Sequence, residues 1–139
     1  LATYGELGRS ALPGHGCKIE FLTPTGIRPG NQLVPVMNPA EYFAGYLRKW
    51  ERFSGIRLVH VTTERIHQQI SLTRTYNLHL HNIRVFGQNG QGLTGMLEVS
   101  VAGSSEFRRE IAVLAKYASY CGSGARTAAG LGQTHIESR

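Results

Sequence analysis

The chain has 139 residues, and 41% of them are hydrophobic, which is enough for one domain with a buried core. Its 15 lysines and arginines against nine glutamates give a net charge of +6 and favour a polyanionic partner such as nucleic acid. The chain contains no aspartate, so the carboxylate cluster of a two-metal nuclease is not expected.

Residues 1–16 form a glycine-rich, irregular segment, which we expect to be a lead-in from a preceding domain that this sequence lacks. Apolar and polar residues then alternate over residues 17–22 as in a strand, and a second extended stretch covers residues 27–36.

Cys17 and Cys121 match neither a disulfide framework nor a zinc site, so both are expected to be reduced. The sequence shows no signal segment or membrane-spanning run, which predicts a cytoplasmic protein without a membrane partner.

The first predicted helix begins after Asn38 and ends at Gly55. Asn38 is a favourable N-cap, Pro39 suits the first helical position, and Glu41 is placed to complete a capping box. Gly55 is well placed as a stop. One face is apolar, and the other carries three basic residues that form either an ordinary solvated surface or an RNA-facing patch: Arg48, Lys49 and Arg52.

The middle of the chain is predicted to be mostly strands. Residues 56–61 have the composition of a short strand, and residues 64–69 that of a loop. A long strand starts at Leu72, and residues 87–92 form a hairpin connection to a partner strand over residues 95–101.

Alternation along the long strand places its side chains on two faces. A change of phase in the apolar residues indicates a bulge near His81 and Asn82. Before this bulge, one face should carry Leu72, Tyr76, Leu78 and Leu80, and the other should carry Thr73, Thr75, Asn77, His79 and His81.

His79 and His81 are candidate functional residues, because two imidazoles on one strand face can bind a metal or catalyse proton transfer. No cysteine or acidic residue stands beside them at ligand spacing, so neither a metal site nor any other cofactor is predicted. An RNA contact and a plain solvated strand face are the other interpretations of this pair.

The last helix takes Ser104 or Ser105 as its N-cap, and a short strand over residues 133–136 follows it. The order strand, helix, strand, strand, helix, strand predicts one α+β domain over residues 17–139. Its fold is ferredoxin-like (RRM-like) βαββαβ, with an antiparallel sheet and two helices on one face. The apolar face of the last helix consists of Phe107, Ile111, Leu114, Ala115 and Ala118.

A glycine-rich loop over residues 122–132 joins the last helix to the last strand. Glycines let backbone amides approach a ligand closely, and consecutive amides can form an anion-binding concavity. A phosphate chain is therefore the expected ligand, and a plain turn between helix and strand is the alternative. The spacing matches neither a Walker loop nor the dinucleotide fingerprint. The loop reads Gly122-x-Gly124-x-x-Thr127-x-x-Gly130-x-Gly132-Gln133.

This pattern, placed after a helix at the end of the chain, resembles the glycine-rich loop of the CRISPR repeat-processing endoribonucleases. These enzymes belong to the repeat-associated mysterious protein (RAMP) superfamily, and the order of elements from Cys17 to Ile136 is similar to their C-terminal half. The resemblance implies that the loop holds repeat RNA and that Arg126 contacts a phosphate. The RNA-binding residues that it implies are Gly122, Ser123, Gly124, Arg126, Thr127, Gly130, Gly132 and Gln133.

The resemblance also implies an activity for the full-length protein, which would be a metal-independent endoribonuclease that matures precursor CRISPR RNA in antiviral defence. The ribose 2′-hydroxyl would attack the adjacent phosphate and leave a cyclic phosphate and a 5′-hydroxyl. The catalytic residues are expected in the missing preceding domain, and His79 and His81 are the candidates within this chain. The implied partners are CRISPR repeat RNA and other CRISPR-associated proteins.

Three alternatives stay open at the level of the sequence. A non-catalytic member of the superfamily would hold guide RNA in an effector complex, and a metal enzyme would use His79 and His81. A generic RRM-like module would stack bases on aromatic residues of the central strands, where Tyr76 is the main one. Tyr117 and Tyr120 flank the glycine-rich loop and either pack in the core or stack on bases.

Overall fold

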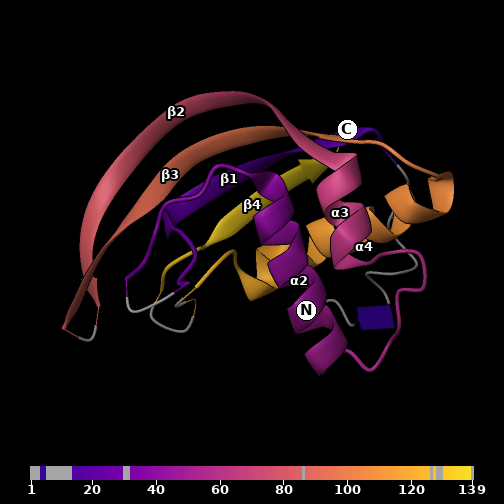
Figure 1. Ribbon diagram of the computed structural model, residues 1–139, viewed down its shortest axis with the longest axis horizontal. Coiled ribbons are helices and arrows are strands. Elements are labelled where there is room, and N and C mark those ends of the chain that lie inside the picture. The colour runs from indigo at the N-terminus through magenta and orange to yellow at the C-terminus, as the bar shows by residue number, and fades with distance from the viewer. Residues whose placement is uncertain are drawn as a thin grey trace.

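The chain folds into a four-stranded antiparallel sheet, and helices cover one of its faces (Figure 1). The structure is a computed structural model that describes residues 4–5, 14–29, 32–85, 87–125, 127 and 130–138. The strand order is β2-β3-β1-β4, which confirms the predicted ferredoxin-like fold, and a short helix, α3, is added to it. The elements are β1 (Gly16–Thr25), α2 (Pro39–Phe53), α3 (Thr63–Gln69), β2 (Ile70–Val85), β3 (Gln88–Val101), α4 (Ser105–Cys121) and β4 (Thr134–Ser138).

Helix α2 begins and ends as its sequence predicts. The side chain of Asn38 accepts a hydrogen bond from the backbone amide of Ala40 at 3.1 Å, and Pro39 occupies the first turn. Gly55 follows the last turn with a φ of +70°. The capping-box role of Glu41 is not what the structure shows, because its carboxylate lies 3.4 Å from His67 Nε2 on α3.

Residues 56–69 differ from the sequence-based prediction in two places. The predicted loop over residues 64–69 is helix α3, which starts after Thr62, whose hydroxyl accepts from the amide of Arg65 at 3.1 Å. The helix escaped prediction because Ile66 is its one buried side chain, so it has almost no apolar periodicity. Residues 56–61 form no strand, and the carbonyl of Ile56 instead accepts from the indole of Trp50 at 2.8 Å.

Strand β2 is irregular earlier than expected. Its pairing with β3 shifts between Leu72 and Arg74 and again between Tyr76 and His79. At the second shift Asn77 has a φ of +51° and faces Gly95 of β3, where a side chain would collide with the Asn77 backbone. The two shifts accompany a strong curvature of the β2–β3 hairpin (Figure 1).

These shifts make the predicted division of β2 into two faces wrong. Leu72 pairs with buried Val99, whereas Tyr76 and His79 pair with Met96 and Thr94 on the opposite, outer face. Each extra residue inverts the side-chain alternation beyond it. The predicted bulge at residues 81–82 is also wrong, because pairing there runs on without a shift.

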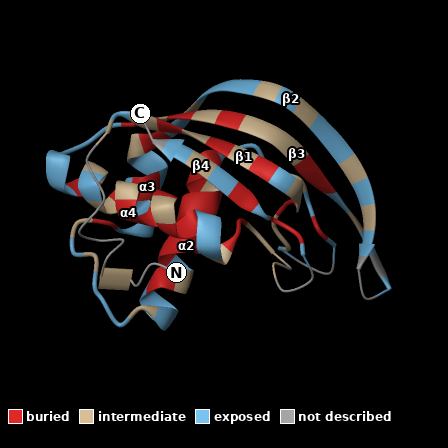
Figure 2. Ribbon diagram, turned by 180° about the vertical axis from the view of Figure 1, so that it is seen from behind, coloured by how far each residue is buried: buried red, intermediate tan, exposed pale blue. Residues whose placement is uncertain are grey.

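The core lies between the inner face of the sheet and the helices. Figure 2 shows buried residues concentrated in α2 and the inner strands, while much of β2 is exposed. Trp50 and Tyr117 meet edge to face, with ring centroids 5.3 Å apart. The predicted apolar face of α4 is confirmed, since all its members are buried: Phe107, Ile111, Leu114, Ala115 and Ala118.

Most of the predicted lead-in over residues 1–16 lies outside the described residues. Within the described part, the Tyr4 ring packs against Trp50 and Tyr117 of this same domain, at centroid distances of 5.2 and 5.4 Å. Cys17 is buried and Cys121 is partly buried, and both are free thiols. Among the described helices, none combines the length and the apolar character that crossing a bilayer requires.

Candidate nucleic-acid interface

The glycine-rich loop leaves α4 at Gly122 and returns to the sheet at β4. The structure describes residues 122–125, 127 and 130–133 of this segment. Arg126 lies outside the described residues, so its predicted phosphate contact stays a prediction.

Backbone hydrogen bonds fasten this loop to the end of β1 and to the turn that follows it. The amide of Ala125 donates to the carbonyl of Gly26 at 2.9 Å, and that of Gly132 donates to Pro24 at 3.0 Å. The amide of Ser123 reaches across the loop to the carbonyl of Gly132 at 2.8 Å. These three amides are therefore paired within the protein and do not form the open anion-binding concavity that the sequence suggested.

Two of the glycines have a structural reason that involves no ligand. Gly124 and Gly132 have φ values of +75° and +72°, in the left-handed region that favours glycine. A side chain at Gly124 would overlap the carbonyl oxygen of Gly26, and one at Gly132 would overlap that of Ser123. Glycine at these positions permits close contact of backbone with backbone, and whether RNA also touches the loop stays a prediction.

Ser123 is fully buried and belongs to a set of hydroxyls beneath the loop. Its Oγ is hydrogen-bonded to the phenol of Tyr46 on α2 and lies 2.6 Å from Thr134 Oγ1 on β4. Thr134 Oγ1 in turn donates to the carbonyl of Gly132 at 2.7 Å. Because this side chain points inward, its position does not support the direct RNA contact predicted for Ser123.

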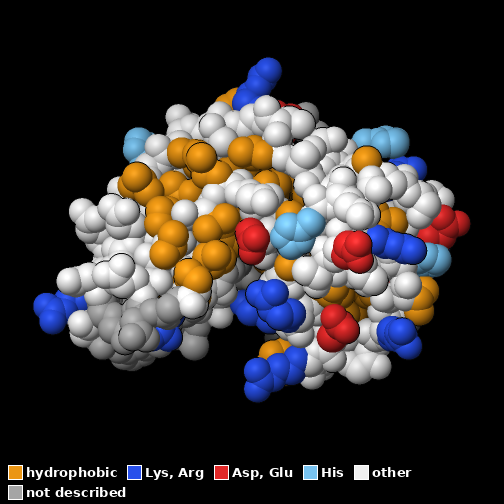
Figure 3. All heavy atoms as spheres, in the orientation of Figure 1, with side chains coloured by type: hydrophobic (Ala, Val, Ile, Leu, Met, Phe, Trp, Pro, Cys, Tyr) orange, Lys and Arg blue, Asp and Glu red, His pale blue; other side chains and the backbone are white. Residues whose placement is uncertain are grey.

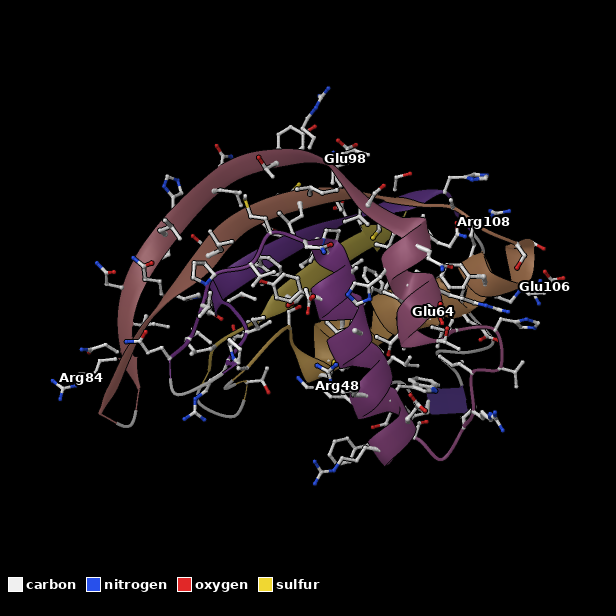
Figure 4. All side chains as sticks on the ribbon, in the orientation of Figure 1. Arg48, Glu64, Arg84, Glu98, Glu106 and Arg108 are labelled. Carbon is white, nitrogen blue, oxygen red and sulfur yellow. The ribbon has the colours of Figure 1, made fainter. Side chains whose placement is uncertain are left out.

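A basic groove of about 570 Å³ runs between the loop and helix α2. Gly124 and Ala125 line one side. The basic face of α2 lines the other side. The three basic residues that the sequence left as either a solvated surface or an RNA-facing patch therefore lie beside the glycine-rich loop: Arg48, Lys49 and Arg52. Figure 3 shows lysine and arginine side chains gathered over α2, and Figure 4 shows Arg48 projecting from the side of this helix.

Further positive charge comes to the groove from Arg28, in the turn after β1. Among the described residues that line the groove, Glu41 is the one acid, and it is paired with His67. The ammonium of Lys49 donates to the carbonyl of Cys121 at 3.3 Å, at the last turn of α4. The groove is thus a cationic surface whose geometry depends on both α2 and the loop.

The family of the chain follows from a comparison of its sequence with known families. The family model of the CRISPR-associated endoribonuclease Cas6 matches residues 19–134. The chain belongs to the Cas6 family. No curated protein matches it significantly.

Solved Cas6 structures share the fold of this chain. Thermus thermophilus Cas6 (TTHB231) superposes with a TM-score of 0.88 at 22% identity, over 98% of this chain and 58% of the Thermus chain. A Cas6 (TTHA0078) product complex gives 0.88 at 22% identity, over 99% of this chain and 57% of the other. A Cas6 (TTHB231) product complex gives a TM-score of 0.87 at 22% identity, over 99% of this chain and 56% of the other. This Cas6-family chain therefore spans little more than half the length of these proteins.

The two tyrosines that flank the loop of this Cas6-family chain have different environments. Tyr117 is buried and packs against Trp50, which agrees with the core interpretation. Tyr120 is 55% exposed and lines a second hollow, of about 390 Å³, together with Thr127 and Gln133. Of the predicted RNA-binding residues, Gly122, Thr127 and Gln133 therefore border a hollow other than the basic groove.

His79 and His81 share the outer face of the β2–β3 hairpin, opposite Thr94 and Gly92. His79 is exposed, and His81 Nε2 lies 2.7 Å from Thr94 Oγ1. Neither lines the basic groove. Within the part of the chain that the structure describes, no three His, Cys, Asp or Glu side chains gather as a metal site would require.

On the described residues of the central strands β1 and β3, no aromatic side chain lies on the outer face, where a generic RRM-like module would stack bases. The outward residues of β1 include Lys18 and Glu20, whose neighbours across the strand pair are Glu98 and Met96 on β3. Tyr76 is on β2, at the edge of the sheet, and its hydroxyl donates to Glu98 at 3.1 Å. This arrangement favours the groove over the sheet as the nucleic-acid interface.

Sequence reasoning missed Tyr46 and Thr134 as members of the site. Tyr46 belongs to the buried face of α2, where a tyrosine in place of phenylalanine signals a buried hydroxyl that needs a partner. That signal does not name the partner, which stands far away in the sequence.

Proposed function

We propose that this chain is the RNA-binding C-terminal part of a CRISPR repeat-processing endoribonuclease, and that the backbone of repeat RNA lies in the basic groove. The observation that carries this proposal is that Arg48 and Arg52 face the glycine-rich loop across one groove. Family membership supports it, and the similar solved structures include Cas6 product and substrate mimic complexes.

Arginines suit this role physically. A guanidinium is always charged and presents a planar set of donors that matches two phosphate oxygens. Arg48 and Arg52 are exposed and stand one helical turn apart, so both can follow a phosphate chain along α2. Each phosphate that they neutralise releases condensed counterions, which makes binding depend on salt.

The chemistry that we propose for the complete protein needs no metal. The ribose 2′-hydroxyl gives up its proton as its oxygen bonds to the adjacent phosphorus. The bond from phosphorus to the 5′-oxygen breaks, and that oxygen takes up a proton, which gives a cyclic phosphate and a 5′-hydroxyl. The protein supplies in-line geometry and charge neutralisation. We further propose that the catalytic residues lie outside this chain and that the protein acts in the cytoplasm with other CRISPR-associated proteins.

The test of the groove is a paired measurement of affinity and salt dependence. In the complete protein, Arg48→Ala with Arg52→Ala should weaken binding of repeat RNA and reduce the slope of log affinity against log salt by about 0.9 per lost phosphate contact. Melting temperature should hardly change, since surface arginines rarely affect stability. Arg109→Ala, on the exposed side of α4, is the matched control. Equal effects of the double variant and the control would contradict the proposed groove.

Metal independence has its own test. Cleavage of repeat RNA by the complete protein should persist in EDTA, and the products should carry cyclic phosphate and 5′-hydroxyl ends. Loss of cleavage in EDTA that returns with added Mg²⁺ would contradict the mechanism. Loss of cleavage in His79→Ala or His81→Ala, with RNA binding intact, would move the active site into this chain.

A further inference from the structure

The buried hydroxyls beneath the loop form a continuous chain between α2, the loop and β4. Their residues, Tyr46, Ser123 and Thr134, are 1%, 0% and 6% exposed, so they are almost completely covered, although Tyr46 borders the basic groove. They come from three separate segments, and the last of them binds the carbonyl of Gly132, which closes the loop.

The direction of this chain follows from counting protons. Each hydroxyl has one proton to donate. Thr134 uses its proton on the Gly132 carbonyl, so Ser123 must donate to Thr134, and Tyr46 must therefore donate to Ser123. Burial raises the pKa of Tyr46 far above its ordinary value, so the phenol keeps the proton that it donates. Aligned hydroxyls of this kind strengthen one another.

The chain of hydroxyls ties together the two sides of the basic groove. Tyr46 stands on α2 between the core and the basic face, and Ser123 immediately precedes Gly124, which lines the groove. We propose that Tyr46, Ser123 and Thr134 are positioning residues that fix the glycine-rich loop against α2 and so hold the groove in the shape that binds RNA. This inference rests on the proposed function, because it assigns to these residues the preorganisation of that same groove.

The fold offers a matched control for a role in stability alone. Tyr42 lies on the same helix and is 1% exposed, and its hydroxyl donates to the carbonyl of Val36 at 2.5 Å. Tyr42→Phe and Tyr46→Phe therefore remove the same atom from the same helix and from equally buried sites. Only the partner differs, since Val36 lies outside the loop.

The experiment compares these variants in the complete protein, with a fluorescein-labelled RNA hairpin that carries a single-stranded flank. Tyr46→Phe should weaken hairpin binding about three- to tenfold, the worth of one hydrogen bond, and Tyr42→Phe should leave it unchanged. The salt slope should be the same in both, because no phosphate contact is lost. Thr134→Val should weaken binding, and Thr134→Ser, which keeps the hydroxyl, should restore it.

A second readout needs no RNA. Hydrogen exchange of peptides that cover residues 122–133 should accelerate in Tyr46→Phe and stay slow in Tyr42→Phe. Equal losses of RNA affinity in the two tyrosine variants, or no rescue by Thr134→Ser, would overturn the positioning role while the proposed function stands. A wild-type protein that binds no hairpin would overturn the proposed function, and the exchange rates would then still decide whether the hydroxyls fix the loop.

Discussion

The two sides of the basic groove are built in different ways. Helix α2 is regular, capped by Asn38 and anchored in the core by Trp50, and it carries its charges on exposed side chains. The glycine-rich loop has no regular structure of its own, its described residues are uncharged, and it is held by hydrogen bonds to Pro24 and Gly26.

This difference separates charge from shape. The charge of the helix can change without moving the backbone, because Arg48 and Arg52 are exposed. The shape of the loop depends on close contacts between backbone atoms, so a side chain added at Gly124 or Gly132 disturbs the fold. Substitutions of the helix arginines should therefore weaken RNA binding, whereas substitutions of the loop glycines should lower stability.

The largest effect is expected at Gly124. Gly124→Ala should lower the free energy of unfolding by about 2 kcal/mol or more, because the new side chain adds an overlap with the Gly26 carbonyl to the strain of a positive φ. Gly130→Ala is the control, since Gly130 also has a positive φ, of +88°, but an added side chain meets nothing within 4 Å. That variant should lose about 1 kcal/mol.

Urea denaturation followed by circular dichroism measures both losses. Equal losses at Gly124 and Gly130 would show that backbone contact with the turn after β1 contributes nothing to stability. The glycines would then be required only for their positive φ angles, and the contrast between the two sides of the groove would weaken.

The helices α2 and α4 could be predicted because their signals are local. Asn38 and Ser104 cap their own helices, and the apolar faces repeat within a few turns. Strands β1 and β3 could likewise be predicted, because apolar and polar residues alternate along each of them. The resulting order of elements was enough to identify the ferredoxin-like fold.

Apart from helix α3, whose local signal is weak, the features that sequence reasoning missed depend on partners that are distant in the chain. The bulge at Asn77 is matched by Gly95 on the neighbouring strand, and neither residue by itself predicts the bulge. A serine in a glycine-rich loop is expected to be exposed. Ser123 is instead buried, and its hydroxyl is hydrogen-bonded to the side chains of Tyr46 and Thr134. A sequence pattern marks a glycine but does not reveal whether a ligand or another backbone lies against it.

An intermediate effect is expected at Arg126, which tests whether the loop also supplies charge. Arg126→Ala should leave the melting temperature nearly unchanged, weaken repeat RNA binding by up to about tenfold, and make the salt slope shallower by about one phosphate contact. Fluorescence anisotropy over a range of salt concentrations measures this, with Arg109→Ala as the control. Unchanged affinity and salt slope would show that the loop contributes only shape, and no charge, to the groove, which would sharpen the contrast with α2.

The smallest effect is expected at Lys49, which belongs to both sides of the groove. Its side chain starts on α2, and its ammonium binds the Cys121 carbonyl at the end of α4, where a cation also interacts favourably with the helix dipole. Lys49→Met should therefore cost about 0.5–1 kcal/mol of stability, and Lys49→Arg, which keeps the charge, should cost less. Since the ammonium is already engaged, RNA affinity should fall less in Lys49→Met than in the double arginine variant. A salt slope that loses a full phosphate contact in Lys49→Met, with stability unchanged, would place Lys49 with the arginines as a simple source of charge and not as a link between helix and loop.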